Sequence, residues 1–326
     1  MTKLLIGELG NVLFGRQFAL IGAIGFDSRC LSVMSNMGKA VPLRVLGVFN
    51  PSSGRDGRDE LGQTFLNVSG PSAQLVGKNC RTVIETVDSL QAELRSPDIS
   101  EGEFVIDITS FSHELLVALI GLLASEGKLK KTTLLYVGAS EYSFNTPKGQ
   151  MWLSRGVTEI RSVLGFPGLM LPSKKLHLIV MAGFEVERAS EVILRYEPNR
   201  LTIAYGEKKS SVSDAHHESN KEFVDKIKCF LEDQQSVAQN IHHFEFSCVD
   251  PFCTANVLIE YVKSCADENI VICPINTKIS TVGAVLAALK LPNVQICYAQ
   301  PAEYNVDGYA KAGDFVTVIP MVDWQE

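Results

Sequence analysis

The stretch from Asp107 to His113 combines side chains that can bind an anion. Asp107, Thr109, Ser110 and His113 lie where a short apolar strand is predicted to pass into a helix. Hydroxyls and backbone N–H groups at such a junction can donate hydrogen bonds to a phosphate, and His113, one turn into the helix, can face the same ligand. Thr109 and Ser110 can alternatively serve only as helix caps. We predict a ligand contact here, with capping as the alternative.

The second half of the chain carries a related polar stretch. Segment 104–123 aligns without a gap on segment 270–289, an offset of 270 − 104 = 166 residues. The aligned stretch contains Asn276, Thr277 and Lys278, which supply an amide, a hydroxyl and a positive charge. We predict these three residues to be ligand contacts at the equivalent junction.

Each half also places a glycine, an aromatic residue and an acid after its first predicted strand. The acids Asp27 and Glu185 are separated by 185 − 27 = 158 residues. Nearby arginines can pair with these acids or reach a phosphate, and the glycines and acids can instead serve only the strand-to-helix turn. The ligand contacts predicted from these two segments are Gly25, Phe26, Asp27, Arg29, Gly183, Glu185 and Arg188.

A third matched block follows further along each half. Segment 136–143 aligns on segment 298–305, an offset of 298 − 136 = 162 residues. It adds Glu141 and Glu303 to the predicted ligand contacts, although the Glu-Tyr pairs in this block can also form purely structural hydrogen bonds. Arg188 lies one position out of register with Arg29, which weakens its assignment as a ligand contact.

Three matched blocks in the same order, with nearly constant offset, indicate an internal duplication. Short β-rich apolar runs alternate with longer helical stretches, which is typical of parallel sheets covered on both faces. The predicted fold class is therefore α/β, with two tandem Rossmann-like repeats, each a mainly parallel sheet with helices on both faces. The strands are predicted at 18–24, 43–49, 104–108, 133–137, 176–182, 200–205, 241–247, 269–273 and 294–299. The helices are predicted at 28–37, 80–95, 110–125, 185–196, 220–236, 252–266 and 278–290.

The repeat also predicts the domain boundaries. The first repeat is assigned to 1–164, the Gly/Pro-rich connector to 165–175 and the second repeat to 176–326. A final strand in each repeat, at 157–163 and 315–320, is expected to close the edge of the sheet. The polar segments 50–62 and 206–222 are predicted to be exposed loops.

Composition favours a globular, cytoplasmic protein. The 46% of hydrophobic residues is ample for two buried cores, and the net charge of −7 argues against an extended nucleic-acid or anionic-membrane surface. No apolar run approaches the roughly 18 residues of a membrane span. The eight cysteines form no C-x-x-C pair and are predicted to be reduced packing residues. The cluster of His242, His243, Cys248 and Cys253 matches no standard zinc spacing, so neither a metal nor a cofactor is predicted.

Taken together, these motifs resemble those of a known family of ligand sensors. Asp107-x-Thr109-x-x-x-His113 is similar to the acid-x-hydroxyl-x-x-x-base motif of the CARF fold, the sensor domain of CRISPR-associated proteins that bind cyclic oligoadenylates. His113 stands where that family usually has Lys or Arg. The fused pair of units also resembles the related SAVED sensors. The resemblance implies a cyclic oligonucleotide second messenger bound between the duplicated halves.

Three functions remain open. The first is a sensor or regulatory subunit in prokaryotic defence that binds an anionic, nucleotide-like small molecule. Because the two halves account for the whole chain, we expect its output to pass through a protein partner or self-association. The second is an enzyme that cleaves the nucleotide, and the third is a protein-binding scaffold. A dinucleotide-dependent oxidoreductase is disfavoured because neither glycine segment has G-x-G-x-x-G spacing.

Overall fold

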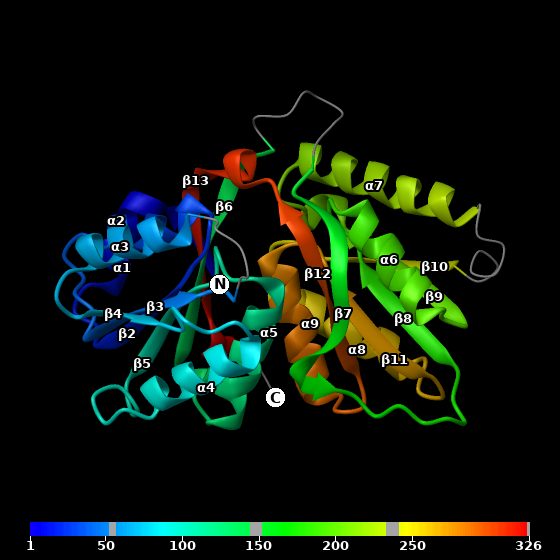
Figure 1. Ribbon diagram of the computed structural model, residues 1–326, viewed down its shortest axis with the longest axis horizontal. Coiled ribbons are helices and arrows are strands. Elements are labelled where there is room, and N and C mark those ends of the chain that lie inside the picture. Colours follow the sequence, from blue (N-terminus) through cyan, green and yellow to red (C-terminus); the bar gives the residue numbers. More distant parts are fainter. Residues whose placement is uncertain (52–56, 144–151, 233–240, 325–326) are drawn as a thin grey trace. The chain divides into compact units, whose positions relative to one another are not determined.

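The protein is built from two α/β units, shown in a computed structural model (Figure 1) that describes residues 1–51, 57–143, 152–232 and 241–324. Unit 1 comprises Met1–Met151 with Val306–Glu326, and unit 2 comprises Trp152–Asn305. Each unit contains one mixed, mostly parallel sheet. This architecture confirms the predicted fold class of tandem Rossmann-like repeats.

Unit 1 contains a seven-stranded sheet in the order β1-β13-β6-β5-β2-β3-β4. Its strands are β1 (Thr2–Leu5), β2 (Phe18–Ile24), β3 (Arg44–Phe49), β4 (Ala73–Val76), β5 (Glu103–Asp107), β6 (Thr132–Tyr142) and β13 (Ala310–Pro320). Strands β2 to β6 are parallel, whereas β13 runs antiparallel to β6 and β1 antiparallel to β13. The strand order reverses between β2 and β5, the position at which open α/β sheets bind ligands.

Helices cover both faces of the unit 1 sheet (Figure 1). They are α1 (Leu9–Leu13), α2 (Ser32–Ser35), α3 (Arg58–Ser69), α4 (Val83–Leu94) and α5 (His113–Ser125), with a short 3-10 turn, η2 (Ser28–Leu31), before α2. All seven residues of β2 are buried, as expected for a strand covered on both sides. Leu9, Leu13, Phe49 and Phe65 form part of the core on one face.

Unit 2 contains a six-stranded sheet in the order β10-β9-β8-β11-β12-β7. Its strands are β7 (Ser154–Pro167), β8 (Leu176–Met181), β9 (Arg200–Gly206), β10 (Ile241–Phe246), β11 (Asn269–Pro274) and β12 (Gln295–Tyr304). Its helices are α6 (Val186–Tyr196), α7 (Asp214–Glu232), α8 (Pro251–Lys263) and α9 (Lys278–Lys290). Only β7 is antiparallel to its neighbour, and the order reverses between β8 and β11.

The last strand of each repeat joins the sheet of the other unit. Strand β7 follows β6 in the chain yet pairs with β12, and β13 follows β12 yet pairs with β6. The two units therefore do not coincide with the two predicted repeats, which were bounded at 164 and 176. Residues 152–164 belong to unit 2, and residues 306–326 belong to unit 1. The predicted connector also overlaps the end of β7. Local sequence patterns do not determine which sheet a final strand joins, because both sheets offer it the same backbone hydrogen-bonding groups.

Two segments predicted as exposed loops contain helices. Helix α3 begins at Arg58 inside the predicted loop 50–62, and α7 begins at Asp214 inside the predicted loop 206–222. Residues 52–56 of the first loop, and 233–236 of the helix predicted at 220–236, lie outside the described residues. Both helices begin with polar turns, and α3 buries little more than Gly62 and Phe65, so the apolar signal for a helix is weak there. Among the described helices, none is both long and apolar enough to cross a membrane.

Candidate functional site

In unit 1, an asparagine links the end of β3 to the loop after β5, across the point where the strand order reverses. Asn50, which directly follows β3, donates from Nδ2 to the Ser110 carbonyl oxygen at 2.7 Å and accepts from the Ser112 backbone N–H at 2.8 Å. A Cβ on Gly25 would lie 3.0 Å from Asn50 Nδ2, so the missing side chain lets Asn50 pass over the end of β2. Asn50 was not among the predicted site residues, although it holds the predicted ligand loop after β5.

Asp107 and Thr109 are directed into the protein. Asp107 Oδ1 accepts hydrogen bonds from the Thr109 backbone N–H at 3.0 Å and from Thr109 Oγ1 at 2.5 Å, while Thr109 Oγ1 accepts from the Val137 N–H at 3.0 Å. Burial raises the pKa of Asp107 to about 7, although the Thr109 hydrogen bonds and the Arg29 charge act in the opposite direction. These two residues fix the loop after β5 to strand β6.

Helix α5 begins at His113, and its cap is Ser112. Ser112 Oγ accepts from the Leu115 backbone N–H at 3.2 Å, so the alternative that Thr109 or Ser110 caps this helix is wrong. Ser110 Oγ is buried without a hydrogen-bond partner among the described residues. His113 is half-buried at the first helical position, close to the helix N–H groups that lack intrahelical acceptors.

Asp27 and Arg29 form a buried ion pair. Arg29 Nη2 and Asp27 Oδ2 are 2.7 Å apart, and the two side chains are 4% and 7% exposed. Arg29 Nη1 also donates to the Val137 carbonyl oxygen at 3.4 Å, and the guanidinium lies 5.9 Å from the centre of the Tyr142 ring. Of the two roles considered for Arg29, the structure places it in the pair with the neighbouring acid.

Unit 2 repeats this arrangement with Glu185 and Arg188. Their charged groups are 2.5 Å apart, Arg188 Nε donates to the Ala299 carbonyl oxygen at 3.1 Å, and its guanidinium lies 5.3 Å from the centre of the Tyr298 ring. Ser154 on β7 donates a short hydrogen bond to Glu185. Arg188 is therefore equivalent to Arg29 despite the shift of one position in sequence register.

A pair of tyrosines accompanies each buried arginine. The hydroxyl oxygens of Tyr136 and Tyr142 are 3.4 Å apart in unit 1, and those of Tyr298 and Tyr304 are 3.3 Å apart in unit 2. The two pairs are separated by 298 − 136 = 162 and 304 − 142 = 162 residues. All four tyrosines lie in the third matched block, from which only Glu141 and Glu303 were predicted to be ligand contacts.

Gly183 lets the loops after β8 and β11 meet in unit 2. A Cβ at this position would overlap the Ile275 carbonyl oxygen. Next to it, Asn276 Nδ2 donates to the Ala182 carbonyl oxygen at 2.5 Å and to Asn220 Oδ1 at 2.9 Å. The glycine and the asparagine thus bring the ends of β8 and β11 and helix α7 together, and Asn220 is a further residue that the sequence analysis missed.

Helix α9 begins beside this contact. Thr277 is its cap, accepting from the Ser280 backbone N–H at 3.1 Å and donating to the Cys248 carbonyl oxygen at 3.0 Å. Lys278 is the half-buried first residue of the helix. The α9 N-terminus and the α5 N-terminus are thus built alike, each following the fourth strand of its repeat.

Unit 2 also contains buried polar atoms without hydrogen-bond partners among the described residues. Among them are Arg188 Nη2, Ser190 Oγ, His216 Nδ1 and Asn220 Nδ2. Asn220 is 0% exposed and Arg188 is 2% exposed. Burial lowers the pKa of His216 to about 4, so its ring is neutral at pH 7. Two of these atoms, on Arg188 and Asn220, can only donate.

The two glutamates of the third block are exposed on their strands. Glu141 forms an exposed ion pair with Lys311 at 2.9 Å, and Glu303 is exposed on β12. Phe26 packs edge-on against Tyr309, with 5.1 Å between ring centres. Within each unit, therefore, the predicted residues after the first and fourth strands follow neighbouring strands, and the third-block glutamates are exposed on the strand beyond.

Comparison with solved structures gives a likeness of fold at low sequence identity. No family model and no curated protein matches the chain. The chain is similar to a solved structure of a type III CRISPR defence DNA nuclease activated by cyclic oligoadenylate, with a TM-score of 0.49 and 9% sequence identity over 91% of this chain and 68% of the other. The α/β assignment given above rests on the chain's own strand order and register.

Proposed function

We propose that the protein binds an anionic, nucleotide-like ligand at the carboxyl edges of its sheets and acts as a sensor or regulatory subunit in prokaryotic defence. One observation carries the proposal: two buried donors at the edge of unit 2, Arg188 Nη2 and Asn220 Nδ2, have no acceptor among the described residues. A buried polar group without a partner costs about 1–3 kcal/mol, so an acceptor supplied by a bound ligand would stabilise each of these donors.

The chemistry around these donors favours an anion. Asn220 contacts Asn276, which immediately precedes the N-terminus of α9 and its first residue, Lys278. A helix N-terminus carries a partial positive charge and N–H groups suited to phosphate oxygens. Because the whole chain has a net charge of −7, attraction of an anion has to come from such local groups.

The choice of a nucleotide rests on the sequence motif. Asp107-x-Thr109-x-x-x-His113 resembles the CARF motif, and unit 1 holds His113 at the N-terminus of α5, as unit 2 holds Lys278 at that of α9. This resemblance makes cyclic oligoadenylates the first ligands to test. Sixteen residues remain proposed as ligand contacts, with Asn220 added to them.

Thermal unfolding of the purified chain with cyclic and linear oligonucleotides, ATP and ADP-ribose tests the proposal. A ligand present at 100 times its Kd should stabilise the protein by about 2.7 kcal/mol and raise the melting temperature by a few degrees. Mass spectrometry of the ligand afterwards separates a sensor, which leaves it intact, from an enzyme that cleaves it. A flat response across the whole panel would contradict the proposal and favour a protein-binding scaffold.

A further inference from the structure

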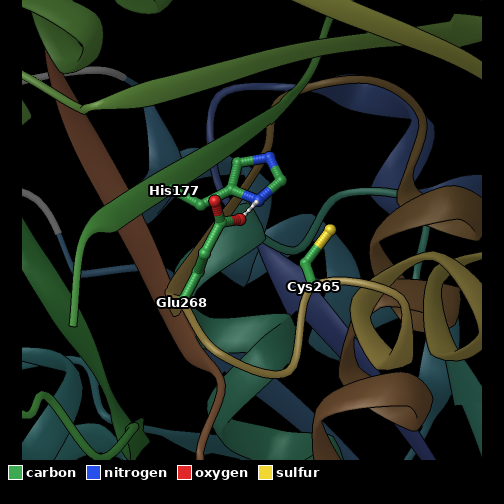
Figure 2. Close-up of side chains that lie close together, drawn as sticks. All are labelled: His177, Cys265 and Glu268. Atoms are coloured by element: carbon green, nitrogen blue, oxygen red, sulfur yellow. Dashed lines mark ion pairs between the residues drawn. The ribbon is translucent and has the colours of Figure 1, made fainter.

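We propose that unit 2 binds a divalent transition metal of the zinc class through His177, Cys265 and Glu268 (Figure 2). The three residues come from separate parts of the unit. His177 is the second residue of β8, Glu268 directly precedes β11, and Cys265 follows the C-terminus of α8. They gather at the amino ends of the parallel strands, opposite the edge proposed for the nucleotide.

The spacing of the three side chains suits one metal ion. One ligand atom from each residue lies within 4.8 Å of the other two, and His177 Nδ1 is 2.7 Å from Glu268 Oε2. Ligands at about 2.0–2.3 Å from a tetrahedral zinc ion are roughly 3.3–3.8 Å from one another. Side-chain adjustments of about an ångström would therefore bring all three to bonding distance, with a fourth position left for water.

The histidine is oriented as metal-bound histidines usually are. His177 Nε2 lies 2.7 Å from Thr202 Oγ1, which lies 2.7 Å from the Tyr261 hydroxyl. A ring nitrogen that donates to a neighbouring oxygen leaves the other nitrogen with its lone pair available to a metal. When Nε2 donates to Thr202, Nδ1 keeps a lone pair that a metal ion can bind.

The contact between His177 and Glu268 already joins two of the three ligands. His177 Nδ1 lies 2.7 Å from Glu268 Oε2, and the two groups form an ion pair when the ring is protonated. His177 is 0% exposed, so water does not screen this contact. A metal ion bound to both atoms would take the place of the proton between them.

The donor set selects the kind of metal, and one neighbour limits its affinity. An imidazole nitrogen and a thiolate favour zinc over magnesium or calcium, which prefer oxygen donors alone. Against binding, Arg200 Nη1 lies 3.4 Å from Glu268 Oε2 and places a positive charge beside the site. Removing that charge should tighten metal binding, whereas a purely structural hydrogen-bond network would gain nothing from its removal.

Equilibrium dialysis of the purified full chain against zinc and cobalt tests the site. One equivalent of zinc should bind, and the cobalt form should show a thiolate-to-metal charge-transfer band. Cys265→Ser should lose both signals, whereas Cys253→Ser, at an exposed cysteine of the same unit, should keep them. Wild-type protein that binds no stoichiometric metal, or Cys265→Ser that binds as well as Cys253→Ser, would overturn the proposal.

Arg200→Met supplies a gain-of-affinity test. It should raise zinc affinity by roughly tenfold, because a like charge a few ångströms from the ion is removed. Should Cys265→Ser fail to fold, the comparison of Arg200→Met with wild type still decides, with zinc-dependent thermal stabilisation as the readout. Unchanged or weaker zinc affinity in folded Arg200→Met would count against the site.

Discussion

Arg29 in unit 1 and Arg188 in unit 2 donate to equivalent backbone carbonyls, Val137 and Ala299, although their sequence positions differ by one residue in the repeat. Arg29 lies in the 3-10 turn η2, two residues after its acid, whereas Arg188 lies in helix α6, three residues after its acid. The different local helix geometry compensates for the shift, so the buried ion pair has been kept in both halves.

Loss of Arg29 should destabilise the protein because it breaks the buried ion pair with Asp27. Arg29→Met leaves Asp27 buried without its partner, and we expect a loss of about 3–5 kcal/mol in the free energy of unfolding. Chemical denaturation measures the loss. Arg95→Met, which breaks the exposed pair with Glu126, is the control and should leave the unfolding midpoint nearly unchanged. Equal effects of the two substitutions would contradict the role assigned to Arg29.

Asp107 should make stability fall as pH rises toward neutrality. Burial raises its folded-state pKa from 3.8 to about 7, so the folded protein holds this proton more tightly than the unfolded chain. The contribution is complete below the unfolded pKa and is lost as pH increases through about 7. Asp107→Asn should remove this part of the pH dependence, which denaturation curves from pH 4 to 8 would reveal. Parallel profiles for the two proteins would refute the assignment.

Asn220 should contribute to ligand binding through its amide nitrogen. Asn220→Asp keeps an oxygen for the Asn276 hydrogen bond but replaces the unsatisfied donor with a negative charge. We expect the affinity for the nucleotide found in the thermal panel to fall by at least about tenfold, as for the loss of a buried hydrogen bond with added charge repulsion. Isothermal titration provides the measurement, and Asn67→Asp on the exposed face of α3 is the control. Equal affinity in both variants would remove Asn220 from the site.

The two glycines that follow the first strands should respond differently to alanine. Gly183→Ala places a methyl group against the Ile275 backbone, which cannot move without shifting the loop after β11. We expect it to cost roughly 1–3 kcal/mol. Gly25→Ala meets only the side-chain amide of Asn50 and should cost less, while Gly7→Ala, with nothing within 4 Å, serves as the control. Melting temperatures that do not follow this order would contradict the packing described here.

Periodicity and repetition in the sequence were enough to predict the α/β class and most of the core elements. Strand β2 was predicted at the residues where it occurs, because a short, fully apolar run between turns has few other solutions in a folded protein. The polar starts of α3 and α7 were missed because a helix with little buried surface has little apolar signal. The sequence also placed Asp27 and Arg29 at one loop, since neighbours in the chain are necessarily neighbours in space.

Only the tertiary structure decided which sheet receives each final strand and which distant side chains meet. β7 and β13 each pair antiparallel with a strand of the mainly parallel part of a sheet, so their own sequences do not distinguish one sheet from the other. Asn50 meets Ser110 across 60 residues, and His177 meets Glu268 across 268 − 177 = 91 residues. Such contacts depend on strand order, which is set by the burial of whole faces. The sequence by itself therefore determined the elements and the local pairs, whereas packing of the sheets determined the sites.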